Sequence, residues 1–299
     1  LDDRNIPLMG VLGAFVFAAQ MINFTIPGTG SSGHLGGGLL LAVLLGPHAA
    51  LLTIASVLTV QALFFADGGL LALGSNIFNL GILPCFLAYP LVYRPIAGRS
   101  DSLPRMTTAS VLAGVAALQV GALGVVLQTT LSGISELPFS TFALLMQPIH
   151  LAIGIVEGLV TAAVLSFLRN AQPEIFTSPG VGRSEAPALK RVLAGLLLAA
   201  ALTGGVLAWF ASERPDGLEW SIARASGSEE IQGARGEVHR SLEQVQQGTA
   251  VLPDYALGDE SAPAQVGTSL SGLVGGIATL LMTGLFALLL RRRGQRQPG

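Results

Sequence analysis

One histidine lies in a loop whose composition suits metal binding. The segment 27–34 reads PGTGSSGH, and its glycines let the backbone bend and approach an ion closely. His34 is the only titratable residue in this segment. A neutral imidazole suits divalent cobalt, nickel, copper or zinc. A lone histidine in a loop is more often solvated or hydrogen-bonded, so the segment alone makes His34 no more than a candidate ligand. The residues expected to support it are Gly30, Ser31, Ser32 and Gly33.

A second pair of polar side chains stands inside an apolar stretch. His150 and Glu157 are seven residues apart, which places them on the same face of a helix. Such groups are costly in lipid and normally face a cavity or another helix. They could be further ligands, the catalytic pair of an intramembrane enzyme, or interhelical hydrogen-bonding groups. Further polar residues expected to pack near the site are Asn23, Gln61 and Asn76.

The sequence contains no recognisable catalytic motif. It has no Gly-rich loop ending in Gly-Lys-Ser/Thr, no Gly-x-Ser-x-Gly turn and no His-Glu-x-x-His helix. Its single cysteine, Cys85, lies beside Pro84 in an apolar run and is interpreted as a small buried hydrophobe. We therefore expect neither ATP hydrolysis nor a prosthetic group.

The elements that position these residues are apolar helices. Of the 299 residues 51% are hydrophobic and only 11% are charged, and the mean hydropathy of +0.64 is too high for a water-facing surface. A bilayer core about 30 Å thick needs roughly 20 apolar helical residues. The sequence thus predicts an all-α polytopic membrane protein with about eight transmembrane helices. They are placed at 8–24, 35–46, 48–66, 70–93, 107–131, 139–168, 191–211 and 268–290.

The second of these stretches is too short to cross a bilayer as a straight helix. It starts in Gly36, Gly37 and Gly38 and stops at Gly46-Pro47. We expect a half-length helix packed against its neighbours, because broken helices of this kind often line a site.

Basic residues are distributed unevenly between the two sides of the predicted membrane. Alternating the eight stretches puts 12 of the 16 Lys and Arg on one side and the other four in loop 212–267. The positive-inside rule then places both ends of the chain in the cytoplasm and this loop outside. Loop 212–267 is polar, so it is expected to bury little core and to be partly ordered, with a short helix around 228–247. The twelve residues are Arg4, Arg94, Arg99, Arg105, Arg169, Arg183, Lys190, Arg191, Arg291, Arg292, Arg293 and Arg296.

A linker rich in proline and glycine divides the chain. It covers residues 170–190, on the side predicted to be cytoplasmic. We predict a six-helix part over 1–169 and a two-helix part over 191–299.

Several stretches resemble the CbiM/NikM family, the substrate-capture component of energy-coupling-factor importers for cobalt and nickel. The first part resembles it in GAFVFAAQMINF at 13–24, in the Gly-Ser-x-x-His loop at 30–34 and in His150 to Gly158. In the second part, RPDGLE at 214–219 resembles the Pro-Asp-Gly-Leu-Glu segment of the companion subunit CbiN/NikN. The resemblance therefore implies a capture subunit fused to its companion.

The resemblance also implies a substrate, a ligand and partners. The substrate would be divalent cobalt or nickel, between which the sequence does not decide, and the family's loop histidine maps onto His34. Family members open with a Met-His segment and one further helix that supply the other nitrogen ligands, so we expect both to precede Leu1 in a full-length protein. Partners would be a CbiQ/NikQ-type coupling subunit and CbiO/NikO-type ATPases in the bacterial cytoplasmic membrane, and no nucleic acid. The alternatives are an intramembrane enzyme using His150 and Glu157, and a structural membrane scaffold.

Overall fold

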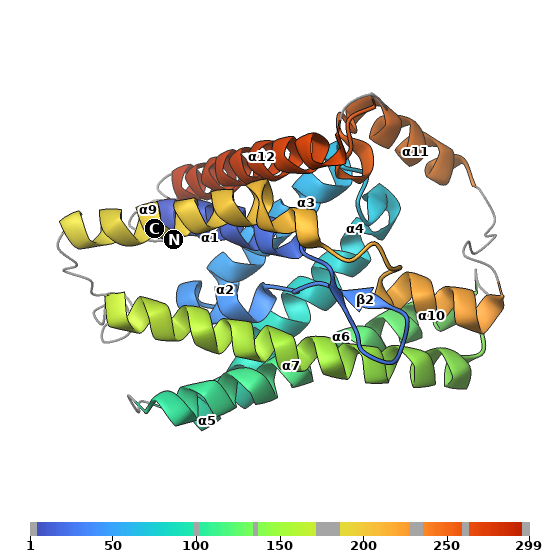
Figure 1. The fold of residues 1–299 in the computed structure, drawn as a ribbon, viewed down its shortest axis with the longest axis horizontal. Helices are drawn as coiled ribbons and strands as arrows, with labels where there is room; N and C mark the ends of the chain where they lie inside the picture. Colours follow the sequence, from blue (N-terminus) through green and yellow to red (C-terminus); the bar gives the residue numbers. More distant parts are fainter. Residues whose placement is uncertain are drawn as a thin grey trace.

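The protein is built almost entirely from helices that lie side by side (Figure 1). A computed structural model describes residues 5–98, 102–133, 137–171, 186–227, 236–258 and 263–294. The first part contains α1 (Asn5–Gln20), β1 (Phe24–Thr25), β2 (Ser32–Gly33), α2 (Gly38–Leu45), α3 (Pro47–Phe64), α4 (Gly69–Ile77), the π-helical turns η1 (Phe78–Ile82) and η2 (Pro84–Tyr93), α5 (Arg94–Ala97), α6 (Leu103–Leu131) and α7 (Phe139–Ala171). The second part contains α9 (Ala186–Gly205), η3 (Leu207–Phe210), α10 (Gly217–Ser226), α11 (Glu237–Thr249), η4 (Pro253–Tyr255) and α12 (Ala264–Gly294).

The helices confirm the predicted all-α polytopic class. Within the described residues, 5 helical stretches are long and apolar enough to cross a membrane: α3, the run Gly69–Ala97, α6, α7 and α12. Every predicted stretch coincides with a helix, but α1 is a shorter apolar helix and the count of eight crossings is not established. Most of the predicted linker 170–190 lies outside the described residues.

The short second helix is as brief as the sequence predicts. α2 has 8 residues, and the glycines at both of its ends, Gly37 and Gly46, have φ of 77°. L-residues with a side chain rarely adopt this left-handed backbone, so glycine permits both chain reversals. Pro47 then starts α3. The half-length helix is buried from Gly38 to Ala42, inside the bundle.

Close packing of α6 on α7 forms one wall of the bundle. A Cβ on Gly158 would lie 2.3 Å from the Cα of Val111, and one on Gly154 would lie 2.7 Å from the Cα of Val115. The two backbones therefore approach closely, in the manner of small-residue interfaces between membrane helices.

The helices of the second part are not a separate unit. α9 and α12 pack against α1 and against each other, and Figure 1 shows them along one side of the molecule. A Cβ on Gly275 of α12 would lie 1.9 Å from Cζ of Phe17, so the Phe17 ring of α1 occupies the space that this glycine leaves.

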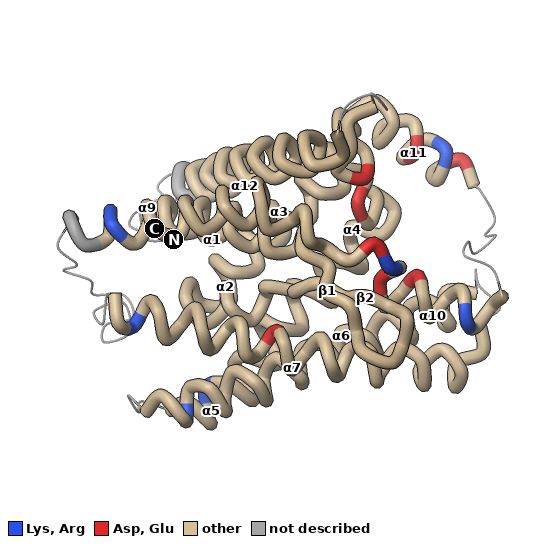
Figure 2. Tube along the Cα trace, in the orientation of Figure 1, with Lys and Arg blue, Asp and Glu red and all other residues tan. Residues whose placement is uncertain are grey.

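Charged residues gather at opposite ends of the bundle (Figure 2). Basic positions mark α5, the last turn of α7 and the start of α9. Most acidic positions lie at the other end, near α4, α10 and α11, together with a few further basic positions. This separation is the one expected of a membrane protein whose loops differ in charge.

Region 212–267 is more structured than the sequence suggested. It contains α10 and α11 joined through residues outside the described part, followed by η4. The predicted helix around 228–247 corresponds in part to α11, whereas α10 was not predicted. Asp216 and Glu219 form a reciprocal capping box at the start of α10. This pair of residues is the sequence signal that indicates the start of the helix. The region also contacts the first part, where Leu252 is buried.

Candidate metal site

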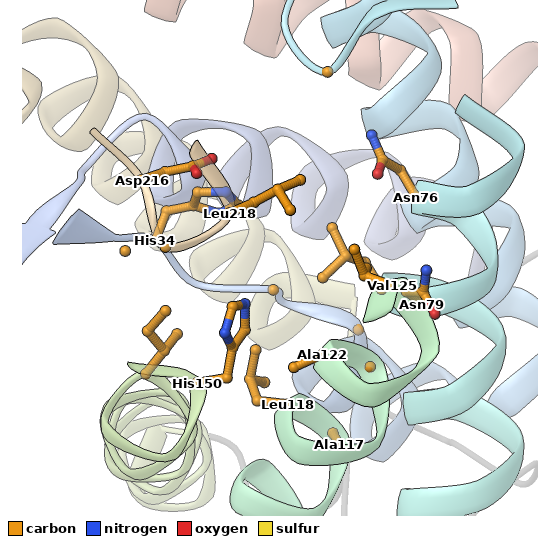
Figure 3. A pocket seen from close by; sticks show the side chains of 18 of the residues that line it. His34, Asn76, Asn79, Ala117, Leu118, Ala122, Val125, His150, Asp216 and Leu218 are labelled. Carbon is orange, nitrogen blue, oxygen red and sulfur yellow. The ribbon is translucent and has the colours of Figure 1, made fainter. Parts of the chain in front are cut away.

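A cavity of about 210 Å³ lies between the first part and region 212–267. His34 and His150 both line it, as do Asp67, Asn76 and Glu157. The segment Asp216–Leu218 contributes the wall on the side of the second part. In Figure 3 His34, Asp216 and Leu218 lie on one side of the hollow and His150 on another.

His34 is held by a short hairpin. β1 and β2 are antiparallel, with Phe24 opposite Gly33. Nδ1 of His34 lies 3.0 Å from the Leu35 carbonyl oxygen, which can only accept, so Nδ1 carries the proton. The lone pair therefore resides on Nε2, the form in which an imidazole can bind a metal ion.

Glu157 fixes the backbone that follows His34. Its carboxylate is 2% exposed and accepts hydrogen bonds from the backbone N–H groups of Gly36 (2.8 Å) and Gly37 (3.0 Å). The Gln20 side-chain amide donates to the Gly36 carbonyl (2.8 Å), and the Gln61 amide donates to Gln20 Oε1 (3.0 Å). Glu157 and Gln61 thus position the loop, because their polar atoms are used in holding it.

His150 reaches the cavity from α7. Nδ1 lies 2.8 Å from the Met146 carbonyl oxygen, one helical turn earlier, so this ring also carries its proton on Nδ1. Gly217 packs against the ring, since a Cβ there would lie 3.3 Å from Cε1 of His150. His150 and Glu157 do line one cavity from one helix, as their spacing predicts.

The remaining predicted residues do not all line the cavity. Asn76 lines it, whereas Asn23 does not, and the Asn23 carbonyl instead accepts from the Ser212 N–H (2.7 Å). Of the glycine-rich loop, Gly33 and His34 line the cavity. The other three predicted supports, Gly30, Ser31 and Ser32, shape the hairpin behind it.

Region 212–267 docks at two places. In the first, which we term the Asp216 contact, residues 212–219 meet the hairpin: the Ser32 N–H donates to the Pro215 carbonyl (2.8 Å) and Ser32 Oγ to the Arg214 carbonyl (2.7 Å). Asp216 and Gly217 also line the cavity, although neither was predicted to do so. The Pro-Asp-Gly-Leu-Glu stretch that contains them was the available signal.

In the second, which we term the Tyr255 contact, residues 252–255 meet the end of α3. The Tyr255 hydroxyl donates to the Asp67 carboxylate, and its ring stacks on Phe65 with centroids 5.0 Å apart. The Leu252 and Asp254 N–H groups donate to the carbonyls of Phe64 (3.1 Å) and Phe65 (2.9 Å). Burial first, and then the negative charge of Asp67, raises the pKa of Tyr255 well above its usual value, so its hydroxyl remains a donor.

The carboxylates at this end of the cavity influence one another. Burial raises the pKa of Glu219, and the charges of Asp216, Asp67 and Asp254 add to this effect. The backbone N–H of Asp216, which donates to Glu219 Oε2 (3.1 Å), opposes it.

The described residues do not make a complete chelate by themselves. Among them, no three His, Cys, Asp or Glu side chains lie close enough together to hold one ion. What the cavity does offer is an imidazole nitrogen on each of His34 and His150.

A bundle of apolar helices around a cavity that a few polar side chains line, with a docked segment beside it, is the architecture expected of a membrane transport component. Residues 1–175 match the CbiM family, described as cobalt uptake substrate-specific transmembrane region, and residues 190–292 match the PDGLE domain. The chain belongs to the CbiM family and carries a fused PDGLE domain. It is a transport protein rather than an enzyme, which confirms the resemblance.

Several relatives share this organisation. The chain is 34% identical to a protein named putative fused nickel transport protein NikMN of Archaeoglobus fulgidus, covering 92% of this chain and 83% of that one. It is 30% identical to the probable fused nickel transport protein LarMN of Lactiplantibacillus plantarum, over 93% of this chain and 84% of that one. It is also 35% identical to the cobalt transport protein CbiM of Sorangium cellulosum, over 56% of this chain and 75% of that one.

Proposed function

We propose that this protein is the metal-capturing membrane subunit of a cobalt or nickel importer, and that His34 Nε2 binds the transported ion. The observation that carries the proposal is the 3.0 Å contact of His34 Nδ1 with the Leu35 carbonyl, which leaves Nε2 available in a cavity that region 212–267 helps to enclose. The names of the relatives and the chemistry of imidazole, a good ligand for both ions, support it.

The ion would enter from the side on which region 212–267 lies. We assign that end to the outside of the bacterial cytoplasmic membrane and the basic end to the cytoplasm, from the positive-inside rule. Release inward would be driven by ATPases of the CbiO/NikO type, through a coupling subunit of the CbiQ/NikQ type. Because ligands must be deprotonated to bind, capture should weaken in acid.

The test is uptake of radiolabelled cobalt and nickel by cells that contain the full-length protein and these partners. His34→Asn keeps an amide able to donate to the Leu35 carbonyl but removes the Nε2 lone pair. We expect His34→Asn to lower uptake at least about tenfold. Mutation of residues that only hydrogen-bond a metal ligand already lowers metal affinity or activity by about tenfold or more.

His48→Asn is the matched control. His48 lies at the start of α3 with its ring 5.2 Å from that of Phe86, and it is not among the cavity-lining residues. Uptake should be unchanged in this variant. Normal uptake by His34→Asn would contradict the assignment of His34.

A further inference from the structure

We propose that His150 is a second binding position for the transported ion, distinct from His34, to which the ion passes on its way through the protein. The inference rests on the proposed function. The proposal concerns the path of the ion after it has left His34. It assigns a role to His150, which is not needed for capture of the ion at His34.

The first argument is the availability of a nitrogen lone pair. The Met146 carbonyl oxygen fixes the His150 proton on Nδ1, and no hydrogen bond to Nε2 occurs among the described residues. A histidine with a purely structural role in α7 would need only the Nδ1 bond. His150 in addition leaves its metal-binding nitrogen unpaired beside a cavity.

The second argument is the composition of the cavity that the ring lines. Its wall includes the apolar residues Leu118, Ile153 and Leu218, and no Lys or Arg among the described residues lines it. Asp216 also lines the cavity, and one of its oxygens, Oδ1, is engaged by the Glu219 N–H (2.8 Å). The other oxygen, Oδ2, has no hydrogen bond within the described part of the chain. An unpaired imidazole nitrogen, a carboxylate and apolar walls together suit a divalent cation of intermediate softness.

The third argument is that His34 and His150 reach the cavity from different elements. His34 follows β2 whereas His150 lies on α7, and Figure 3 shows the two rings on different sides of the hollow. Two separate and individually incomplete positions suit transfer, because an ion must bind well enough to enter and weakly enough to leave.

The experiment combines two conservative variants of the full-length protein. His150→Asn keeps an amide donor for the Met146 carbonyl and removes the Nε2 lone pair. Equilibrium binding of Co²⁺ to the purified protein and uptake with the partner subunits are measured for His34→Asn, His150→Asn and the double variant. His48→Asn serves as the control, and the melting temperature of each variant tests folding.

We expect His150→Asn to retain capture through His34 but to lower uptake about tenfold or more. We expect His34→Asn to show a weaker residual binding of Co²⁺ that the double variant loses. X-ray absorption of cobalt bound to His34→Asn should show an imidazole ligand that is absent from the double variant, a signature that a packing role would not produce.

Two results would overturn the proposal: unchanged uptake by His150→Asn, or equal residual binding by His34→Asn and the double variant. These results differ from failure of the proposed function, which would appear as normal uptake by His34→Asn. If His150→Asn lowers the melting temperature, X-ray absorption of cobalt bound to His34→Asn and to the double variant still tests the proposal. This measurement requires only that the ion be bound.

Discussion

The two contacts of region 212–267 are built from different interactions. In the Asp216 contact Ser32 donates to the Arg214 and Pro215 carbonyls, Gly217 lies against His150, and Leu218 packs on a cluster that includes Phe142. The Tyr255 contact is an aromatic cluster, in which Phe65 stacks on Tyr255 with ring centroids 5.0 Å apart and Phe17 lies tilted against Phe65 at 5.4 Å. Three residues there with side chains, Ala66, Asp254 and Tyr255, have φ between 50° and 60°, a left-handed conformation that tertiary contacts must stabilise.

The difference indicates that the two contacts have different stabilities. Buried aromatic area contributes more than a few backbone hydrogen bonds, whose net contribution is small because water competes for the same groups. We infer that the Tyr255 contact anchors region 212–267 and that the Asp216 contact, which borders both cavity histidines, opens more readily.

The largest effect is expected from overfilling the Asp216 contact. A Cβ on Gly217 would lie 2.7 Å from Cγ2 of Ile149, so Gly217→Leu has no room while region 212–267 is docked. Overpacking of this kind costs about 1–3 kcal/mol, which corresponds to a shift of about fivefold to 150-fold in the docking equilibrium. Hydrogen exchange of residues 217–226 should rise and metal uptake should fall.

Gly248→Leu is the control for this prediction. Gly248 lies in α11 with no atom near its hypothetical Cβ, so the same substitution should leave exchange in α10 and uptake unchanged. Unchanged exchange of residues 217–226 in Gly217→Leu would show that this glycine does not determine docking.

Hydropathy predicted the bundle well because lipid imposes a simple rule on the backbone. A spanning segment must satisfy its own hydrogen bonds, so every predicted stretch proved helical. The glycines at Gly37 and Gly46 correctly predicted the half-length α2. A search for long apolar stretches missed α10, which has only 10 residues. Its Leu218, Ile222 and Ala225 pack against a core cluster at helical spacing, so an amphipathic pattern was present in the sequence.

The site was predicted in part, for a similar reason. Residue type and local sequence marked His34 as the histidine of a glycine-rich loop and His150 and Glu157 as polar groups in an apolar stretch, and all three line the cavity. The partner of Glu157 was not predictable, since the N–H groups of Gly36 and Gly37 are 121 and 120 residues away in the chain. Asp216 was missed because its place in the cavity depends on docking of a distant region.

A smaller effect is expected from the anchoring contact. Tyr255→Phe keeps the ring that stacks on Phe65 and removes the hydroxyl that donates to Asp67. Loss of one such bond costs about 1 kcal/mol, so exchange of residues 252–256 should rise about fivefold while α10 is little changed. A larger rise in α10 than in 252–256 would contradict the assignment of the Tyr255 contact as the anchor.

The smallest effect should be a dependence of the Asp216 contact on pH. Because docking raises the pKa of Glu219, the docked state binds the proton more tightly than the undocked one. Docking should therefore be strongest below the ordinary pKa of 4.5, weaken as the pH rises toward the raised pKa, and change no further above it. Hydrogen exchange of residues 217–226, corrected for the intrinsic pH dependence of exchange, should follow this course.

Glu219→Gln isolates this carboxyl from the neighbouring titratable groups. Glutamine can still accept from the Asp216 N–H and so preserves the capping box, but it carries no charge beside Asp216, Asp67 and Asp254. The variant should be more protected than the parent at neutral pH, and the difference should vanish in acid. Contributions from His34 and His150 are common to both proteins and cancel in the difference. A difference that persists unchanged into acid would mean that the substitution alters packing, and that the charge of Glu219 does not oppose docking.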